Sequence, residues 1–259
     1  MRAPAVRTHN AQPFNEQTTP NQMNIALIGY GKMGKMIESV ALSRGHQIVC
    51  VIDPLTSTQT FDSPAFRSAD VAIEFSRPDA AESNIRQAIA QNVPVVSGTT
   101  GWNAAALRNE LSQTSHPGII WSSNYSVGVN ILFAVNRYLA QLLHHSGGYT
   151  PSITEVHHIH KLDAPSGTAV TLRESISQEL RATSQDSMPN KPIDCPIESI
   201  REGEVPGIHE VRWESEADIL TLRHEAKSRQ GFALGAVLAA EYLAGKRGWH
   251  TMNEVMNIQ

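Results

Sequence analysis

The sequence has only two cysteines, Cys50 and Cys195, among its 259 residues. Two thiols this far apart in the chain provide neither a disulfide framework nor a thiolate metal site. Such sparse use is typical of proteins kept in a reducing compartment. We therefore expect a cytoplasmic protein.

An excess of positive charge and long hydrophobic runs are also missing. Lys and Arg number 21 against 25 Asp and Glu, a net charge of −4, which argues against an electrostatic nucleic-acid binder. The most apolar late stretch, residues 231–245, is too short for a membrane span and contains Glu241, so it predicts a packed helix. We expect neither nucleic acid nor a membrane as a partner.

Residues 1–22 lack the apolar core that a secretory signal needs, and they are polar and rich in Pro, Gln and Asn. They predict a disordered tail before the fold, or an upstream start ahead of Met23.

The first positive signal is a glycine-rich turn. The apolar run NIALIGY predicts a strand, which leads into Gly29-Tyr30-Gly31-Lys32-Met33-Gly34 and then a helical pattern. In a dinucleotide site the first glycine permits the turn, the second admits the pyrophosphate to the helix N-terminus, and the third allows close packing. A glycine turn alone also recurs for structural reasons, so the context decides. A second apolar strand ends in Asp53, placed to bind the adenosine ribose, and we predict a dinucleotide site.

Strand and helix patterns continue to alternate, with strands near residues 69–76, 92–97 and 118–122 and a helix near 80–92. Two turns follow strands at the edge where a cofactor would lie, although ordinary strand-end turns are the structural alternative. The predicted contacts in these turns are Gly98, Thr99, Thr100, Ser122, Ser123, Asn124 and Tyr125.

The segment TEVHHIHKLDAPSGT (154–168) has the highest density of ionisable groups in the chain. A strand over 152–160 places His157 on one face with Glu155, and His158 with His160 on the other. After Lys161 the chain turns, and Ser166 is expected to cap a helix.

This histidine segment has three interpretations. His158 and His160 offer two zinc ligands, but no cysteine or HExxH helix accompanies them, so we predict no metal. Structural histidines are the second alternative. We favour an anion-binding, proton-donating site, because imidazole titrates near neutrality and a lysine adds fixed charge. The N–H groups of Gly167 and Thr168 would add a second carboxylate cradle at the helix start.

The segment EVHHIHKLDAPSGTA resembles the signature of the 4-hydroxy-tetrahydrodipicolinate (formerly dihydrodipicolinate) reductase family of bacterial lysine and diaminopimelate synthesis. The resemblance covers the chain beyond residue 22, through NIALIGYGKMG, SGTTG, SSNYSVGVN and RHEAKSRQGFALGA.

This resemblance implies that His157 is the general acid/base, Lys161 a second proton donor and carboxylate ligand, and His158 a substrate contact. It implies that Gly167 and Thr168 hold the other carboxylate, and that the cofactor occupies the glycine loop, Asp53 and the two turns. The implied reaction is NAD(P)H-dependent reduction of a small cyclic dicarboxylate, 4-hydroxy-tetrahydrodipicolinate, to tetrahydrodipicolinate with loss of water. The implied assembly is a homotetramer built through the sheet of the second domain.

Two other functions keep part of the pattern. An aspartate or homoserine dehydrogenase would lack HHxHK followed by PSGT. A catalytically silent NAD(P)-binding sensor would keep the glycine loop without needing His157 and Lys161.

Asp53 and Pro54 predict NADH as the preferred cofactor, with NADPH second. The Asp53 carboxylate would repel the 2′-phosphate of NADPH, and Pro54 offers it neither charge nor N–H. Lys32 or Lys35, swinging toward that phosphate, would restore dual use.

The predicted fold class is α/β: a Rossmann-like, doubly wound nucleotide-binding domain with an inserted α+β mixed-sheet domain. The first comprises residues 23–126 and 227–259, and the second, for substrate binding and oligomerisation, residues 127–226. Strand patterns in the insert fall at 152–160, 196–203, 209–215 and 218–226.

Overall fold

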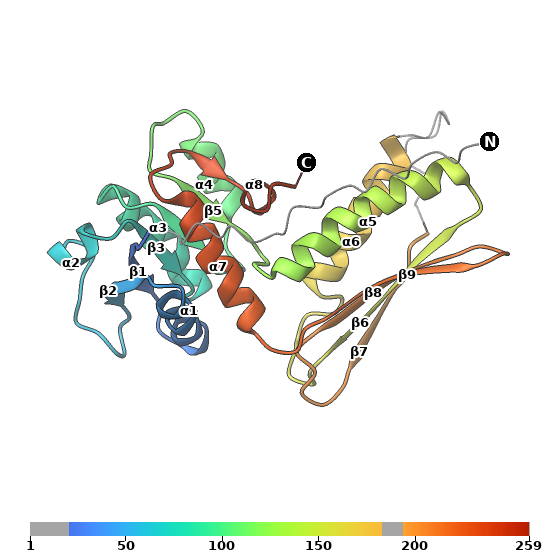
Figure 1. Ribbon diagram of the computed structural model, residues 1–259, viewed down its shortest axis with the longest axis horizontal. Coiled ribbons are helices and arrows are strands. Elements are labelled where there is room, and N and C mark those ends of the chain that lie inside the picture. Colours follow the sequence, from blue (N-terminus) through green and yellow to red (C-terminus); the bar gives the residue numbers. More distant parts are fainter. Residues whose placement is uncertain (1–20, 183–193, 259) are drawn as a thin grey trace, which may run out of the picture.

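The computed structural model describes residues 21–182 and 194–258, arranged as two lobes (Figure 1). The predicted tail falls on residues 1–22, of which 1–20 lie outside the described residues. The first lobe contains a six-stranded sheet and the second a four-stranded sheet. The predicted α/β class, with a separate mixed sheet, is confirmed.

The six-stranded sheet is parallel throughout, and its order is β10-β5-β4-β3-β1-β2. Its strands are β1 (Asn24–Ile28), β2 (Gln47–Ile52), β3 (Val71–Glu74), β4 (Val95–Ser97), β5 (Ile119–Trp121) and β10 (Trp249–His250). The strands are short and mostly apolar because helices cover both faces of a parallel sheet. The strand order reverses between β1 and β3, and such a switch point is where doubly wound sheets bind ligands.

Helices on the two faces of this sheet come from different parts of the chain. Helices α1 (Lys32–Ser43), α7 (Gln230–Leu243) and α8 (Met252–Val255) share one apolar core. Helices α2 (Pro64–Arg67), α3 (Pro78–Ala90) and α4 (Ala104–Leu111) contribute to the core on the other face. The expected packed helix at 231–245 is α7, whose alanines are fully buried. Among the described residues, no helix combines the length and apolar character needed to cross a membrane.

The second sheet has the order β7-β6-β8-β9. Its strands are β6 (Thr150–His157), β7 (Ile197–Arg201), β8 (Ile208–Glu214) and β9 (Ile219–Glu225). Only the β6–β7 pair is parallel, so the sheet is mixed as predicted. Helices α5 (Val127–Ser146) and α6 (Gly167–Ala182) pack on one face around Ile153, Leu172 and Trp213.

Strand β6 differs in one respect from the predicted strand. It alternates as expected, and Glu155 and His157 both lie on the buried face. It ends at His157, however, because the Lys161 N–H bonds the His158 carbonyl in a turn. The expectation that His158 and His160 share the opposite strand face is therefore wrong.

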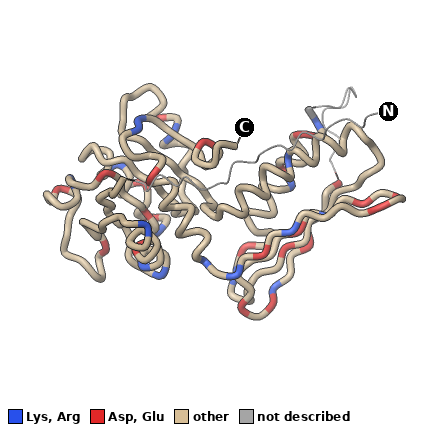
Figure 2. The backbone as a smooth tube through the Cα atoms, viewed as in Figure 1, with Lys and Arg blue, Asp and Glu red and all other residues tan. Residues whose placement is uncertain are grey.

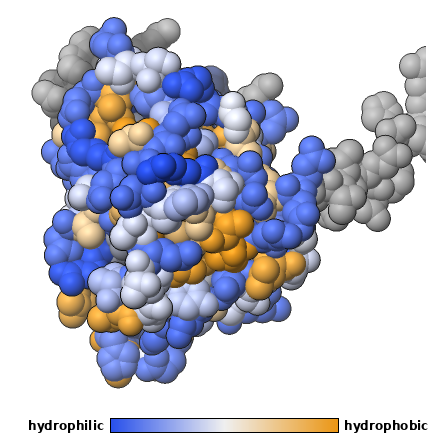
Figure 3. All heavy atoms as spheres, turned by 90° about the vertical axis from the view of Figure 1, so that its left-hand side faces the viewer, coloured by the Kyte–Doolittle hydropathy of each residue, from blue (hydrophilic) through white to orange (hydrophobic). Residues whose placement is uncertain are grey.

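Charge and hydropathy are mixed over the described surface. Figure 2 shows both signs of charge in both lobes, and on the second sheet Arg223 pairs with Glu210 and Glu225. Viewed from the end of the first lobe (Figure 3), hydrophobic side chains form separate small groups within a mainly hydrophilic surface.

Candidate active site

A cavity of about 590 Å³ receives side chains from both lobes. Eleven of the predicted site residues line it: Met33, Gly98, Thr100, Ser123, Asn124, Tyr125, His157, His158, Lys161, Gly167 and Thr168. The other predicted residues lie outside its lining: Gly29, Tyr30, Gly31, Lys32, Gly34, Asp53, Thr99 and Ser122. The cavity thus joins one end of the glycine loop to the histidine segment.

The glycine loop has the geometry that a pyrophosphate requires. A Cβ at Gly29, which has φ +90°, would collide with the Phe75 carbonyl, and a Cβ at Gly34 would collide with the Gly29 carbonyl. Gly31, the N-cap residue of α1, has no atom within 4 Å of an added Cβ and provides no side-chain cap. The first and third glycines are therefore required by packing, whereas the second leaves the backbone open beside free helix N–H groups.

Asp53 directly follows β2 and contacts the glycine loop. Its Oδ2 accepts the Tyr30 N–H at 2.9 Å, and its Oδ1 accepts the Leu55 N–H at 2.9 Å and the Thr56 N–H at 3.1 Å. Burial raises the pKa of Asp53, but these hydrogen bonds outweigh it and hold the pKa below its usual value. The group is an ionised carboxylate at the end of the second strand.

The ends of β3 and β4 are held by the buried carboxylate of Glu74. Ser97 Oγ donates to it at 2.6 Å and Thr99 Oγ1 at 2.8 Å. Thr99 therefore faces the protein interior, while its neighbours Gly98 and Thr100 line the cavity. Gly98 packs against the ring of Phe75, where a Cβ would collide.

The turn after β5 also mixes interior and cavity contacts. The Tyr125 hydroxyl lies 2.9 Å from the Ser97 carbonyl, and the Ser122 hydroxyl donates to the Asn124 carbonyl at 2.9 Å. The Asn124 amide donates to Thr168 Oγ1 at 3.1 Å, which joins the first lobe to the start of α6. A predicted cofactor residue and a predicted substrate residue are thereby in direct contact.

His157 occupies the last position of β6 and is buried. Its Nδ1 bonds the Glu155 carboxylate, and its ring meets that of His209 edge-on, with centroids 5.0 Å apart. A Cβ built on Gly207, in the cavity wall, would lie 3.1 Å from Nε2. Burial lowers the pKa of His157, Glu155 raises it, Lys161 and Arg201 lower it, and the net pKa is below the usual value.

Lys161 lies in the cavity wall and is paired with Asp163. Its Nζ donates to the two carboxylate oxygens at 2.7 and 2.9 Å. Burial raises the pKa of Asp163, but Lys161, the Asp163 backbone N–H and Arg201 together lower it below its usual value, so this carboxylate is ionised. A substrate carboxylate would have to compete with Asp163 for the ammonium group.

The start of α6 agrees with the predicted cap, because Ser166 Oγ accepts the Ala169 N–H at 3.3 Å. Gly167 and Thr168 follow in the cavity wall, and nothing lies within 4 Å of a Cβ added at Gly167. The first turn of this helix can therefore receive an anion.

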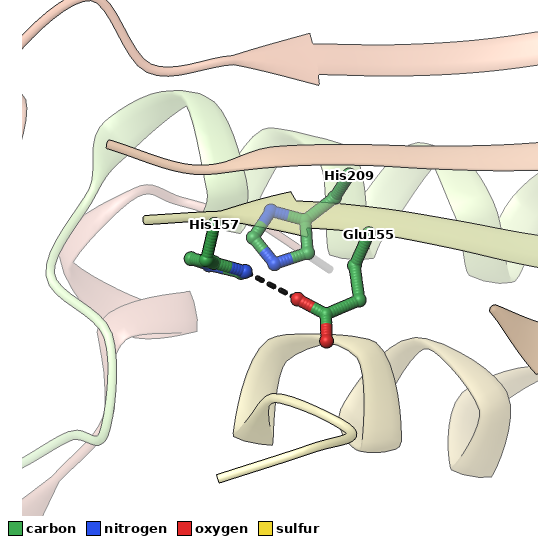
Figure 4. A group of neighbouring side chains, drawn as sticks. All are labelled: Glu155, His157 and His209. Atoms are coloured by element: carbon green, nitrogen blue, oxygen red, sulfur yellow. Dashed lines mark hydrogen bonds and ion pairs between the residues drawn. The ribbon is translucent and has the colours of Figure 1, made fainter. Parts of the chain in front are cut away.

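The two histidines of the zinc alternative lie with their ring centroids 6.0 Å apart but differ in exposure. His158 lines the cavity, whereas His160 is exposed and pairs with Glu204 at 3.2 Å. Among the described residues, a different group, Glu155, His157 and His209, brings its nitrogen and oxygen atoms within 4.8 Å of one another (Figure 4). The Arg201 guanidinium bonds Glu155 at 2.9 Å, so a cation already occupies that carboxylate. We interpret the group as a hydrogen-bond network.

Several cavity residues were not among the predicted site residues, including Phe75, His209, His224 and Arg229. Burial, followed by the charge on His157, lowers the pKa of His209 to about 4, and burial also lowers the pKa of His224. Both rings are therefore neutral near pH 7. The only sequence signals for them are isolated histidines in strand patterns, which are more often structural.

Comparison with known proteins covers both halves of the chain. The family described as dihydrodipicolinate reductase, N-terminus, matches residues 23–125, and that described as dihydrodipicolinate reductase, C-terminus, matches residues 128–256.

Among curated proteins, the 4-hydroxy-tetrahydrodipicolinate reductase of Christiangramia forsetii is 44% identical over 91% of this chain and 98% of its own. That of Akkermansia muciniphila is 38% identical over 75% and 82%. A dipicolinate-bound dihydrodipicolinate reductase from Paenisporosarcina sp. TG-14 has a similar fold, with a TM-score of 0.70, 22% identity, and coverage of 92% of this chain and 100% of that one.

Proposed function

The chain belongs to the dihydrodipicolinate reductase family, and from that premise we propose the roles of its cavity residues in the reaction. It is an NAD(P)H-dependent oxidoreductase that reduces 4-hydroxy-tetrahydrodipicolinate to tetrahydrodipicolinate with loss of water, in lysine and diaminopimelate synthesis. The dehydrogenase and silent-sensor alternatives fall away, because both halves of the chain match this family. The observation that carries the assigned roles is a single cavity lined by the turns of the first lobe and by His157, Lys161 and the start of α6.

His157 is the proton donor in this proposal. When bound, the reduced nicotinamide supplies a hydride, and its addition to the conjugated ring leaves an electron-rich enamine. His157 donates a proton from Nε2 to the nucleophilic carbon of this enamine, because its Nδ1 already bonds Glu155. In the free protein burial lowers the pKa of His157, and a bound dicarboxylate raises it again by adding negative charge nearby. Substrate binding therefore favours the protonated form of His157.

Lys161, His158, Gly167 and Thr168 bind the substrate. The Lys161 ammonium group leaves Asp163 and binds one substrate carboxylate, and the N–H groups of Gly167 and Thr168 bind the other. Holding both carboxylates orients the substrate ring toward His157. This orientation lowers the entropic cost of reaching the transition state.

Three finer assignments belong to the same proposal. NADH is the preferred cofactor because the ionised Asp53 repels a 2′-phosphate, although Lys32 and Lys35 lie in and next to the loop. The enzyme acts in the cytoplasm, as its two free and buried cysteines suggest. The substrate domain comprises residues 127–226, because α7 and β10 pack with the first lobe.

The fourth finer assignment is a homotetramer built through the second sheet. Strand β9 is largely exposed, including Ile219 and Leu220. Helix α5 also exposes Ile131, Val135, Tyr138 and Leu142, which lie on one helix face. Apolar surface of this kind marks interaction sites.

The test compares steady-state turnover of wild type, His157→Gln and His160→Gln. We expect His157→Gln to lower kcat by about two orders of magnitude with little change in the KM for NADH, as for loss of a general acid. His160→Gln is the matched control, because this exposed ring pairs with Glu204 and lies outside the cavity lining, so turnover should stay normal. Near-normal turnover of His157→Gln would remove this histidine from the mechanism.

A further inference from the structure

Four functional groups meet at one end of the second sheet because of its strand register. In the central strand β6, Glu155 and His157 lie on the same face. Glu155 lies opposite His209 of β8, and His157 lies opposite Arg201 of β7. Figure 4 shows the Glu155 carboxylate between the two imidazoles and the start of α6.

Glu155 is a fully buried carboxylate whose oxygens have different partners. Oε2 bonds His157 Nδ1, while Oε1 accepts Arg201 Nη2 at 2.9 Å and the Ser166 N–H at 3.3 Å. Arg201 Nη2 also donates to the Asp163 carbonyl at 2.6 Å, which fixes the guanidinium. A buried charge is tolerated only when it is paired and hydrogen-bonded in this way. Burial raises the pKa of Glu155, but Arg201, Ser199 and His157 together lower it below the usual value.

We propose that Glu155 and Arg201 are positioning residues for His157: Glu155 accepts the Nδ1–H, so Nε2 is the nitrogen that carries and delivers the proton. This inference rests on the proposed role of His157 as the acid. A neutral imidazole has one N–H, and a carboxylate beside Nδ1 keeps it there. In the transfer the Nε2–H bond breaks, its electron pair stays on Nε2, and a C–H bond forms on the substrate. The ring is left as the Nδ1–H tautomer that Glu155 already binds.

Arg201 holds the other oxygen of Glu155, so that the carboxylate stays ionised and aimed at Nδ1. His209 closes the other side of the ring but does not compete as an acid, because its pKa is about 4.

The charges around His157 give this role a distinct signature. Four titratable or charged groups face it: Glu155 on β6, Arg201 on β7, His209 on β8 and Lys161 in the loop after β6. Of these, Glu155 favours the protonated ring, and the cationic groups oppose it. Removing the charge of Glu155 should therefore lower the pKa of His157, whereas a residue with only a packing role would not change it.

The experiment measures kcat against pH for wild type, Glu155→Gln, Arg201→Lys and Glu198→Gln. Because the acid must be protonated, kcat falls as pH rises through the pKa of His157 in the substrate complex. In Glu155→Gln we expect this decline to move to lower pH by about one to three units, with kcat near pH 7 reduced about tenfold or more.

Arg201→Lys should shift the decline of kcat with pH less than Glu155→Gln does. A lysine retains the positive charge but not the forked geometry of the guanidinium group. Glu198→Gln, an exposed carboxylate on β7, should behave as wild type. An equal loss of kcat at every pH in Glu155→Gln, with no movement of the decline, would overturn the proposal.

Nitrogen NMR of ¹⁵N-histidine wild type provides a measurement that does not depend on the folding of a variant. With His157→Gln used to assign the signal, we expect the neutral ring of His157 to be protonated at Nδ1. Protonation at Nε2 overturns the inference, whatever the kinetics show. If His157→Gln is inactive while Glu155→Gln keeps the wild-type profile, only this inference fails. If His157→Gln turns over normally, the proposed acid itself is wrong.

Discussion

At the scale of single residues, Asp53 shows how a cofactor contact is shared with the fold. Its Oδ1 receives the Leu55 and Thr56 N–H groups and the Thr56 hydroxyl, whereas within the described part of the chain Oδ2 receives only the Tyr30 N–H. A carboxylate oxygen has about two acceptor sites. Oδ2 therefore has capacity for a ribose hydroxyl, and a phosphate in the same place would meet its negative charge.

This arrangement predicts the effect of Asp53→Ala on cofactor choice. Wild type should use NADH with the higher kcat/KM, and the variant should lose about five- to tenfold of that preference, because one like-charge contact with NADPH is removed. Asp62→Ala, an exposed carboxylate in the same lobe that bonds Thr60, is the control. The repulsion argument is refuted if wild type favours NADPH and the variant gains no NADPH activity.

Sequence reasoning reaches some residues of the His157 network and misses others for a physical reason. The period of two along a strand placed Glu155 and His157 on one face, as the structure shows. Arg201 and His209 are 44 and 52 positions from His157, and only the pairing of β6 with β7 and β8 brings them together. Register between distant strands is not visible in a single sequence.

At the scale of elements, the start of α6 combines support and binding. Ser166 is buried, caps the helix through Ala169, donates its own N–H to Glu155 and lies 3.3 Å from His209 Nε2. Ser166 therefore links the helix terminus, the cavity wall and the network around His157 by direct hydrogen bonds.

We expect Ser166→Ala to lower the free energy of unfolding by about 1 kcal/mol, as for loss of an N-cap. The KM for the dicarboxylate should rise several-fold while the KM for NADH stays constant, since the first turn of α6 holds a carboxylate. Ser126→Ala removes the equivalent cap of α5, with its bond to Val129, and controls for stability alone. If the two variants have equal KM values for the substrate, the first turn of α6 does not hold the substrate carboxylate.

The predicted elements differ most from the observed ones where a loop contains apolar residues. The strand expected over 152–160 continued past His157 because Ile159 maintains the alternation. In the structure the Ile159 N–H bonds the Gly203 carbonyl and the Lys161 N–H bonds His158, so the chain leaves the ladder. Local turn hydrogen bonds prevailed over the hydrophobic pattern, and His160 became exposed.

At the scale of the whole molecule, the cavity exists only because the two lobes face each other. The glycine loop and the histidine segment were predicted separately from local patterns, and the fold class followed from the alternation of strands and helices. The distance between the two sites depends on α5, α7 and the Asn124–Thr168 hydrogen bond. These are contacts between segments that no sequence period encodes.

The proposed assembly gives a prediction at this scale. Light scattering after gel filtration should give the mass of four chains for wild type. Leu220→Glu, which places a charge on exposed β9, should shift the mass toward smaller species. Leu55→Glu alters an even more exposed leucine in the first lobe and should leave the mass unchanged. A wild-type mass of one chain at micromolar concentration would contradict the tetramer.

The position of α7 and β10 in the first lobe has a consequence for synthesis on the ribosome. Strands β1 to β5 are made first, but one face of their sheet is covered by α7, and β10 extends the sheet beside β5. Both segments are translated after the entire second lobe. The second lobe is therefore the first unit that can fold to completion as the chain emerges. Until α7 is made, the earlier strands have one apolar face that α1 covers only in part, as expected of a discontinuous domain.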